Sequence, residues 1–276
     1  MADAATARPF SIVALAGKLA GRAIVYALFP VVLSQAFALR RHALTLVPAA
    51  GPSAGRVGRG EPLHFLAIGD SIVAGVGARR VERSTVVHVA RFMAGRLARE
   101  INWHTAGIIG AGARRVRRDA LAQLPQRPFD VIMLSVGVND VLKLERSGRF
   151  RRQLLKLIHE LRRHSPQAII GYVGLPPLEA FPKLKRPLRW IVGRRVRRFD
   201  ALARETVMRV PNALHIPVRV APRPHLFSED GLHPAEPGQR RLAKIIADAL
   251  TPHVARSAAG PIRADRVRFH SQEPVA

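Results

Sequence analysis

The chain has 276 residues, 48% of them hydrophobic, which suits one α/β domain of about 190 residues with extensions. It has no cysteine, which excludes disulfides, thiolate catalysis and zinc–thiolate sites. Forty-five basic residues against 19 acidic ones give a formal net charge of +26, which attracts polyanions without choosing among them. Aromatic residues make up only 5%, and no run interleaves them with basic residues, which argues against a nucleic-acid partner.

The first apolar stretch runs from Ala23 to Leu39 and has arginines on both sides. A bilayer-spanning helix needs about twenty apolar residues, and Pro30 interrupts this stretch. We predict that residues 1–48 attach the protein to a membrane. Both flanks of the apolar stretch are basic, so the distribution of positive charge does not indicate on which side of the membrane the protein lies. The alternatives are cleavage as a secretory signal, giving a secreted or periplasmic protein, and a cytoplasmic location. Residues 49–61, rich in Gly, Pro and Arg, are predicted to be a linker.

An apolar run from Leu63 to Ile68 predicts a buried parallel strand, and it ends in Gly69-Asp70-Ser71. Open α/β folds bind ligands beyond the carboxyl ends of such strands, which is where Ser71 would lie. A nucleophilic serine needs a base to take its proton and donors to hold the oxyanion. Gly-Asp-Ser is also common turn chemistry, so the prediction depends on partners elsewhere in the chain.

Glycines follow the next predicted strand, at Gly107, Gly110 and Gly112. They let the backbone approach a ligand and present N–H groups at a helix N-terminus. A dinucleotide-binding loop is the alternative, but the order here is G-x-x-G-x-G, and the acidic residue Asp130 opens its strand instead of closing it. A basic cluster comes next, which either faces solvent or attracts anionic substrates: Arg114, Arg115, Arg117 and Arg118.

Another apolar strand-like run, Phe129 to Val136, ends in Gly137-Val138-Asn139-Asp140. The run predicts a strand whose carboxyl end lies at the same edge of the sheet as Ser71. The Asn139 amide has two N–H donors, one of which can point at an oxyanion. Asn-Asp after a strand is also ordinary turn chemistry, so this motif is weak when taken singly.

Further along, basic and apolar residues alternate at helical spacing. The apolar positions are Val192, Val196 and Phe199, and the basic ones are Arg194, Arg195, Arg197 and Arg198. The pattern predicts a helix with an apolar stripe and is typical of a solvated basic face.

Asp230 and His233 stand three residues apart in a loop rich in Pro and His. In a tight turn the carboxylate can orient the imidazole and stabilise its charged form, which makes the histidine an effective base. The pair can also bind a metal, but no further histidine or carboxylate cluster stands near at metalloprotease spacing. We therefore predict no metal and no cofactor. The other ten histidines are predicted to be surface or packing residues, among them His88, His104, His159 and His225.

Strand-like and helix-like segments alternate along the chain, which predicts a parallel sheet. The predicted strands are Leu63 to Ile68, Ile101 to Thr105, Phe129 to Val136, Ala168 to Val173 and Ala213 to Ile216. The predicted helices are Glu82 to Glu100, Ala113 to Gln123, Phe150 to Arg163, Pro187 to Arg209 and Pro237 to Leu250. The expected α/β fold is a flavodoxin-like three-layer sandwich with a five-stranded parallel sheet over residues 62–251. Residues 252–276 are predicted to be a flexible tail.

Four motifs, which contain Ser71, Gly110, Asn139 and the pair Asp230/His233, resemble the sequence blocks of the SGNH hydrolases, also called the GDSL esterase/lipase family. The resemblance covers about residues 62–251. The resemblance implies that Ser71 is the nucleophile and that its backbone N–H belongs to the oxyanion hole. It implies that Gly110 and Asn139 complete this hole. It also implies that His233 is the base, that Asp230 is the orienting acid, and that the chain has the SGNH hydrolase fold.

The predicted function is a serine ester hydrolase acting on an acetyl or longer acyl ester of a small molecule or lipid. One alternative is an acyltransferase that uses the same acyl-enzyme. The other is a non-catalytic basic protein that binds a polyanion or an anionic membrane surface. The sequence leaves the acyl chain, the alcohol and the oligomeric state open.

Overall fold

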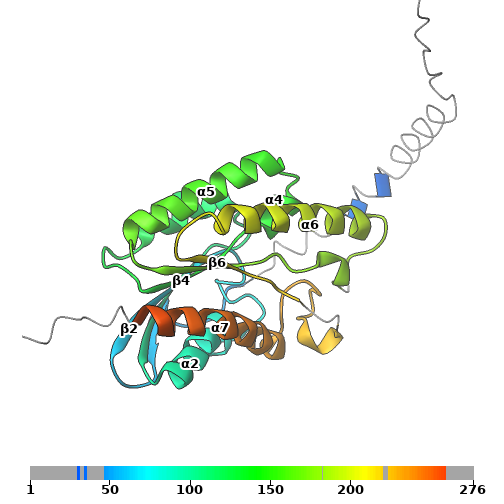
Figure 1. Cartoon of the computed structure of the whole chain (residues 1–276). Coiled ribbons are helices and arrows are strands. Elements are labelled where there is room, and N and C mark those ends of the chain that lie inside the picture. Colours follow the sequence, from blue (N-terminus) through cyan, green and yellow to red (C-terminus); the bar gives the residue numbers. More distant parts are fainter. Residues whose placement is uncertain (1–29, 32–33, 36–46, 182, 220–222, 259–276) are drawn as a thin grey trace, which may run out of the picture.

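A computed structural model describes residues 30–31, 34–35, 47–181, 183–219 and 223–258. A mixed sheet lies between two layers of helices, so the predicted three-layer α/β fold is confirmed (Figure 1). Most of the predicted membrane-attachment segment, residues 1–48, lies outside the described residues. Among the helices that the structure describes, none combines the length and the apolar character needed to cross a bilayer.

The sheet has six strands in the order β1-β3-β2-β4-β5-β6. In chain order these are β1 (Ala54–Val57), β2 (Pro62–Gly69), β3 (Glu100–Gly107), β4 (Val131–Ser135), β5 (Ile169–Val173) and β6 (Ala213–Ile216). The five predicted strands are all present and parallel. The sixth, β1, pairs antiparallel with β3 inside the predicted linker 49–61. Sequence reasoning missed it because this short, mostly exposed Ala-Gly-Arg-Val segment has no apolar pattern and is ordered by pairing with β3.

Six helices flank the sheet or its carboxyl edge: α2 (Thr85–Leu97), α3 (Ala113–Arg115), α4 (Val138–Leu142), α5 (Ser147–His164), α6 (Leu188–Val207) and α7 (Glu236–Ala258). Three predicted helices differ clearly from the observed ones. The helix predicted over Ala113 to Gln123 is α3 followed by a π-helical turn (Val116–Ala120) and a 3-10 turn (Leu121–Gln123). α2 begins only after Ser84, whose hydroxyl caps it by accepting the Val87 N–H, and it ends before Ala98, which has a left-handed φ of 50°. α7 continues past the predicted start of the tail at residue 252, because Val254 extends its buried stripe.

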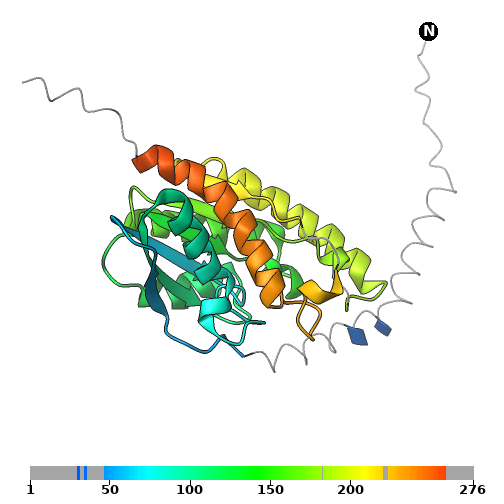
Figure 2. The same ribbon diagram turned by 90° about the horizontal axis from the view of Figure 1, so that it is seen from below.

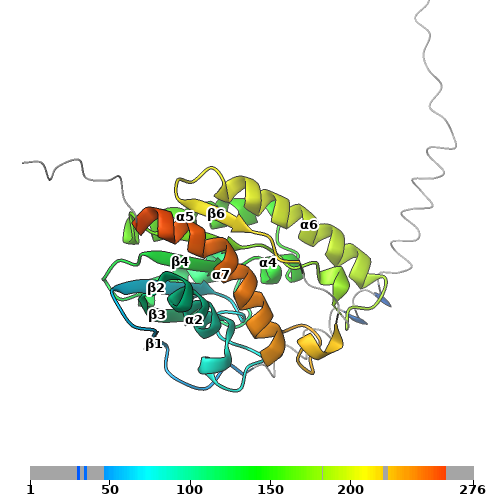
Figure 3. The ribbon, with the colours of Figure 1, turned by 60° about the horizontal axis from the view of Figure 1, so that its bottom comes forward.

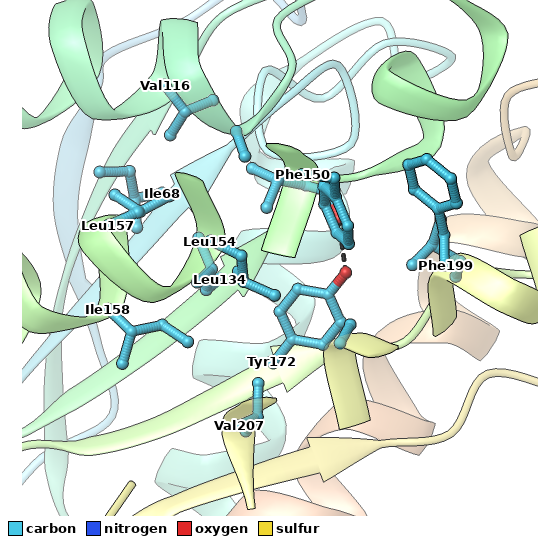
Figure 4. Close-up of a cluster of buried hydrophobic side chains, with 14 of the residues drawn as sticks. Ile68, Val116, Leu134, Phe150, Leu154, Leu157, Ile158, Tyr172, Phe199 and Val207 are labelled. Atoms are coloured by element: carbon cyan, nitrogen blue, oxygen red, sulfur yellow. Dashed lines mark hydrogen bonds between the residues drawn. The ribbon is translucent and has the colours of Figure 1, made fainter. Parts of the chain in front are cut away.

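The two helical layers cover opposite faces of the sheet, as Figures 2 and 3 show for α2 and α7 on one face. Side chains of β2 alternate between the two cores: Leu66 and Ile68 face α5 and α6, while Phe65 and Ala67 face α2 and α7. The α5–α6 core is also shown in Figure 4, where Tyr172 lies among aliphatic side chains. Its hydroxyl is satisfied because it donates to the Val136 carbonyl oxygen at 2.7 Å.

The strand order determines where the site lies. β2 is the first of the parallel strands and has β3 on one side and β4 on the other. The chain adds β3 on one side of β2 and then β4 on the other, so the order of the strands reverses at β2. The carboxyl end of β2 is therefore a topological switch point, and Asp70 and Ser71 follow it directly. In open α/β sheets such points are where ligands bind.

Candidate active site

Ser71 lies in the turn that follows β2, and its side chain is almost buried, with 8% of the residue exposed. The turn is held from both neighbouring strands. The Asp70 N–H donates to the Ser135 carbonyl at the end of β4 (3.0 Å), and the Thr105 hydroxyl of β3 donates to the Val73 carbonyl (2.9 Å). Within the turn, the Val76 N–H donates to the Ser71 carbonyl at 3.0 Å. The turn that carries the serine is thus held by hydrogen bonds from β4, from β3 and within itself.

His233 reaches Ser71 across 162 positions of sequence. Its Nε2 lies 2.8 Å from the Ser71 hydroxyl oxygen, and its Nδ1 lies 2.6 Å from Asp230 Oδ2. The second carboxylate oxygen, Oδ1, accepts the backbone N–H groups of Leu232 (2.8 Å) and His233 (2.9 Å) and the Ser228 hydroxyl (2.7 Å). The turn therefore presents one carboxylate oxygen to the ring and uses the other to hold its own shape.

These contacts also set the charge of Asp230. Partial burial alone would raise the pKa of its carboxyl group, but the donors from His233, Leu232 and Ser228 outweigh that and hold the pKa well below its usual range. The carboxylate is therefore ionised at neutral pH. An ionised Asp230 accepts a hydrogen bond from the Nδ1–H of His233. The ring's other nitrogen, Nε2, is then free to accept a hydrogen bond from the Ser71 O–H.

Gly110 lies in the loop between β3 and α3, which is joined to the nucleophile turn where the Ile108 N–H donates to the Gly69 carbonyl (2.9 Å). Gly110 has a φ of +70°, a left-handed conformation that suits glycine. Its carbonyl accepts the Lys143 ammonium at 2.6 Å. Within the described residues, no hydrogen bond uses the backbone N–H of Gly110 or that of Ser71. Both N–H groups are thus available to a ligand.

Asn139 lies in the first turn of α4, directly after β4. Its side-chain nitrogen donates to the Ala111 carbonyl at 3.1 Å, which uses one of its two N–H bonds and ties α4 to the glycine loop. The other N–H bond remains for a ligand. The predicted site residues thus fall into two groups, each joined by its own hydrogen bonds: Ser71, His233 and Asp230 in one, and the Gly110 loop with Asn139 in the other.

Asp140, the last residue of the Gly137–Asp140 motif, holds the glycine loop. Its carboxylate accepts the Ala113 N–H at 3.0 Å. A Cβ at Gly112 would lie 2.7 Å from the same carboxylate, so only glycine allows this approach. Burial raises the pKa of Asp140 to about 6, and burial likewise raises that of Asp70 to about 6. The sequence signal for Asp140 was its place directly after Asn139.

Gln239 was missed altogether. It is fully buried on α7, and its side-chain nitrogen donates to the carbonyls of Val76 (2.8 Å) and Pro234 (3.1 Å). Its oxygen accepts the Thr85 N–H at 3.0 Å and also the Thr85 hydroxyl. It therefore joins the Ser71 turn, the His233 loop and the start of α2. The available signal was one polar residue in an otherwise apolar helical stripe: Gln239, Ala243, Ile246 and Leu250.

The remaining predicted clusters have simpler roles. In the basic run after the glycine loop, Arg117 pairs with Glu160 (2.9 Å), and Arg115 (3.3 Å) and Arg118 (2.5 Å) pair with Asp119. One histidine outside the site has an acidic partner and is a packing residue, stacked on Tyr172. His215 Nε2 lies 2.9 Å from Asp200. No cluster of three or more histidine, aspartate or glutamate residues that could hold a metal is found in the described part of the chain.

Known proteins resemble this chain in sequence family and in fold. Residues 67–241 match the model of a family described as the "GDSL-like Lipase/Acylhydrolase family". In a comparison with curated proteins, no match was found.

Several solved structures share the fold. The lipase Lip_vut3 from a goat rumen metagenome is 20% identical, with a TM-score of 0.57 over 68% of this chain and 97% of its own. The esterase EstA from Pseudoalteromonas sp. is 17% identical, with a TM-score of 0.55 over 70% of this chain and 98% of its own. A lipase/acylhydrolase from Enterococcus faecalis is 21% identical, with a TM-score of 0.54 over 69% and 96%.

At these identities the solved structures establish the fold alone, whereas the family match covers more than half of the chain. The chain belongs to the GDSL-like lipase/acylhydrolase family, also called the SGNH hydrolases, and is a carboxylic ester hydrolase.

Proposed function

We propose that the protein hydrolyses acyl esters through a Ser71–His233–Asp230 triad. The observation that supports this most directly is the chain of two short contacts, 2.8 Å from Ser71 Oγ to His233 Nε2 and 2.6 Å from His233 Nδ1 to Asp230. This is the arrangement that lets an imidazole take a serine proton while a carboxylate stabilises the resulting imidazolium.

In the first step Ser71 Oγ attacks the acyl carbonyl carbon, and its proton passes to His233 Nε2. The carbonyl oxygen becomes an oxyanion. When the tetrahedral intermediate collapses, the bond to the alcohol breaks and the alcohol leaves with the proton from Nε2. Water then attacks the acyl-enzyme with the same base, which releases the acid and restores Ser71.

The oxyanion is proposed to be held by the backbone N–H groups of Ser71 and Gly110 and by the side-chain amide of Asn139. Their support is that both backbone groups have no partner within the described residues and that Asn139 retains one unused N–H bond. Donors fixed before the reaction stabilise the charge as it develops, without the cost of reorganising solvent.

The catalytic unit is proposed to be residues 62–251 with the continuation of α7, and residues 1–48 are proposed to attach it to a membrane. The apolar sequence from Ala23 to Leu39 supports the attachment. The substrate is proposed to be an acetyl or longer acyl ester, either a small molecule or a lipid.

The test is hydrolysis of p-nitrophenyl acetate and butyrate by purified Ser71→Ala protein. We expect a loss of about 10⁴-fold or more in kcat/KM, because removing the nucleophile disables the whole triad. Ser257→Ala, an exposed serine near the end of α7, is the matched control and should keep full activity. A fluorophosphonate should label wild type at Ser71, as seen by mass spectrometry.

A Ser71→Ala enzyme with wild-type rate would rule out the triad. Product analysis with an added alcohol separates the two acyl acceptors: free acid indicates hydrolysis, and a new ester indicates transfer to the alcohol.

A further inference from the structure

The outer face of α6 carries an exposed stripe that the ester chemistry does not use. Its members recur every three or four residues, so they lie along one side of the helix. They are Trp190, Arg194, Arg197, Ala201, Arg204 and Met208, the last just beyond the helix end. Over 18 positions the stripe is about 27 Å long, at about 1.5 Å per residue.

The stripe is unusual for a solvated helix because it exposes large apolar side chains. Trp190 is 65% exposed and Met208 is 66% exposed. The apolar side of the same helix is buried in the core through Val192, Val196 and Phe199. The inner face of α6 is thus apolar, and its outer face also carries an apolar residue at each end, Trp190 and Met208.

Positive charge surrounds these two residues. Arg194 and Arg204 are exposed and form no ion pair within the described part of the chain. A hollow of about 230 Å³ lies beside Trp190 and is lined by Arg186, Arg189, Trp190, Gly193 and Arg197, with Glu179 paired to Arg197. Guanidinium groups bind phosphate oxygens in bidentate fashion, and tryptophan favours the headgroup region of bilayers.

The amino end of α6 contacts Gln35, one of the few described residues before position 47. Gln35 donates through Nε2 to the Arg186 carbonyl (2.9 Å) and accepts the Leu188 N–H (3.3 Å). Figure 1 shows the described pieces of this segment, in blue, beside that end of α6. Gln35, which belongs to the stretch proposed above to meet a membrane, therefore contacts the backbone just before Trp190, the first residue of the stripe.

The same end of α6 adjoins the candidate active site. The segment before α6 packs against the His233 loop, with Phe181 edge-on to Phe227 at 5.1 Å between ring centres. A Cβ at Gly231, next to Asp230, would lie 2.6 Å from Lys183. A surface that touched this end of α6 would thus lie at the sheet edge that holds Ser71.

We propose that the outer face of α6 binds the surface of an anionic lipid bilayer, with Trp190 and Met208 in the headgroup region and the arginines on lipid phosphates. Nucleic acid is the less suitable polyanion, because the stripe contains a single aromatic residue and no series of stacking side chains. This binding does not depend on the proposed chemistry of Ser71.

The test uses the full chain with vesicles of phosphatidylcholine, with and without phosphatidylglycerol. The readout is the ratio of the partition coefficients for the two compositions, which separates charge-dependent binding from insertion of the N-terminal segment. Arg194→Gln/Arg204→Gln should lower this ratio roughly thirtyfold, at about fivefold for each arginine near an anionic surface. Arg240→Gln/Arg241→Gln removes the same charge from exposed positions on α7 and should leave it within about threefold of wild type.

Tryptophan fluorescence locates the contact. The chain has two tryptophans, and Trp103 is only 4% exposed, so brominated phosphatidylcholine in phosphatidylglycerol vesicles should quench Trp190 alone. Trp190→Phe should abolish the quenching. Ser71→Ala should bind and be quenched like wild type, which distinguishes a failure of this proposal from a failure of the proposed chemistry.

Equal effects of the two arginine pairs would overturn the proposal, as would quenching that persists in Trp190→Phe. Binding of a single-stranded oligonucleotide that depends on Arg194 and Arg204, without charge-dependent vesicle binding, would overturn it in favour of a nucleic-acid surface.

Discussion

The two helical layers hold different parts of the candidate site. On the α2–α7 side, Gln239 joins the Ser71 turn to the His233 loop, so this layer supports the proposed proton transfer. On the α5–α6 side, Asn139 and Asp140 hold the glycine loop, so this layer supports the proposed oxyanion hole. The site therefore depends on two sets of contacts that meet only at the carboxyl edge of the sheet.

The layers also differ in charge. Helices α5 and α6 carry twelve arginine or lysine residues and three acidic ones, whereas α2 and α7 carry six and two. The α5–α6 layer, which is proposed to bind anionic lipid, is thus the more basic one. The α2–α7 layer contributes Gln239, which is fully buried.

The largest expected effect concerns the proton-transfer side. Asp230→Asn should lower kcat about 10⁴-fold, because an amide no longer favours the required protonation of the His233 ring. Steady-state kinetics on p-nitrophenyl butyrate measure this. The control is Glu229→Gln, the exposed neighbouring carboxyl group, which should change kcat little. Equal activity in the two variants would remove Asp230 from the triad.

The next effect tests the oxyanion side. Asn139→Ala should lower kcat by roughly 10²- to 10³-fold with a smaller change in KM, because the lost donor acts mainly on the transition state. Asn102→Ala, a half-buried amide within β3, is the control. If KM alone rose, Asn139 would bind substrate without stabilising the oxyanion.

The third prediction uses the pH dependence of stability on the oxyanion side. The pKa of Asp140 is raised to about 6 from the ordinary 3.8, so between these values the folded protein binds more protons than the unfolded chain. This contribution to stability is full below about pH 4 and is lost as the pH rises through 6. Asp140→Asn cannot ionise, so its stability relative to wild type should increase by about 2 kcal/mol between pH 4 and 7.

Urea unfolding at several pH values measures this difference. Asp119→Asn, whose carboxyl group in wild type pairs with Arg115 and Arg118, should show no such increase. A difference between Asp140→Asn and wild type that did not change with pH would show that Asp140 is not held at a raised pKa.

The smallest effect sharpens the role of the α2–α7 side. Gln239→Ala should cost about 1 to 3 kcal/mol of stability, since it leaves buried groups of Thr85, Val76 and Pro234 without partners. If Gln239 also positions the catalytic loops, kcat should fall about tenfold at a temperature where the variant is fully folded, with KM unchanged. Gln123→Ala, an exposed position, is the control. A stable fold with wild-type kcat would limit Gln239 to a structural role.

The parallel strands and their order along the chain were predictable from sequence, because buried strands are continuous apolar runs that end in turn residues. The edge strand β1 was not, because its pairing energy comes from β3 and leaves no pattern in its own residues. The extension of α7 was missed for a related reason: burial of Val254 against the core keeps the chain helical past Pro252, and that burial comes from tertiary packing.

The sequence by itself determined which residues are available for chemistry and that they stand at strand ends, since motif and strand pattern are local properties. Only the tertiary structure decided that a hydroxyl at 71 meets an imidazole at 233, that Gln239 joins their loops, and that Asp140 lies buried against Gly112. Such contacts join segments far apart in the chain, and their energies depend on burial and on geometry to within tenths of an ångström. No local pattern in the sequence carries that information.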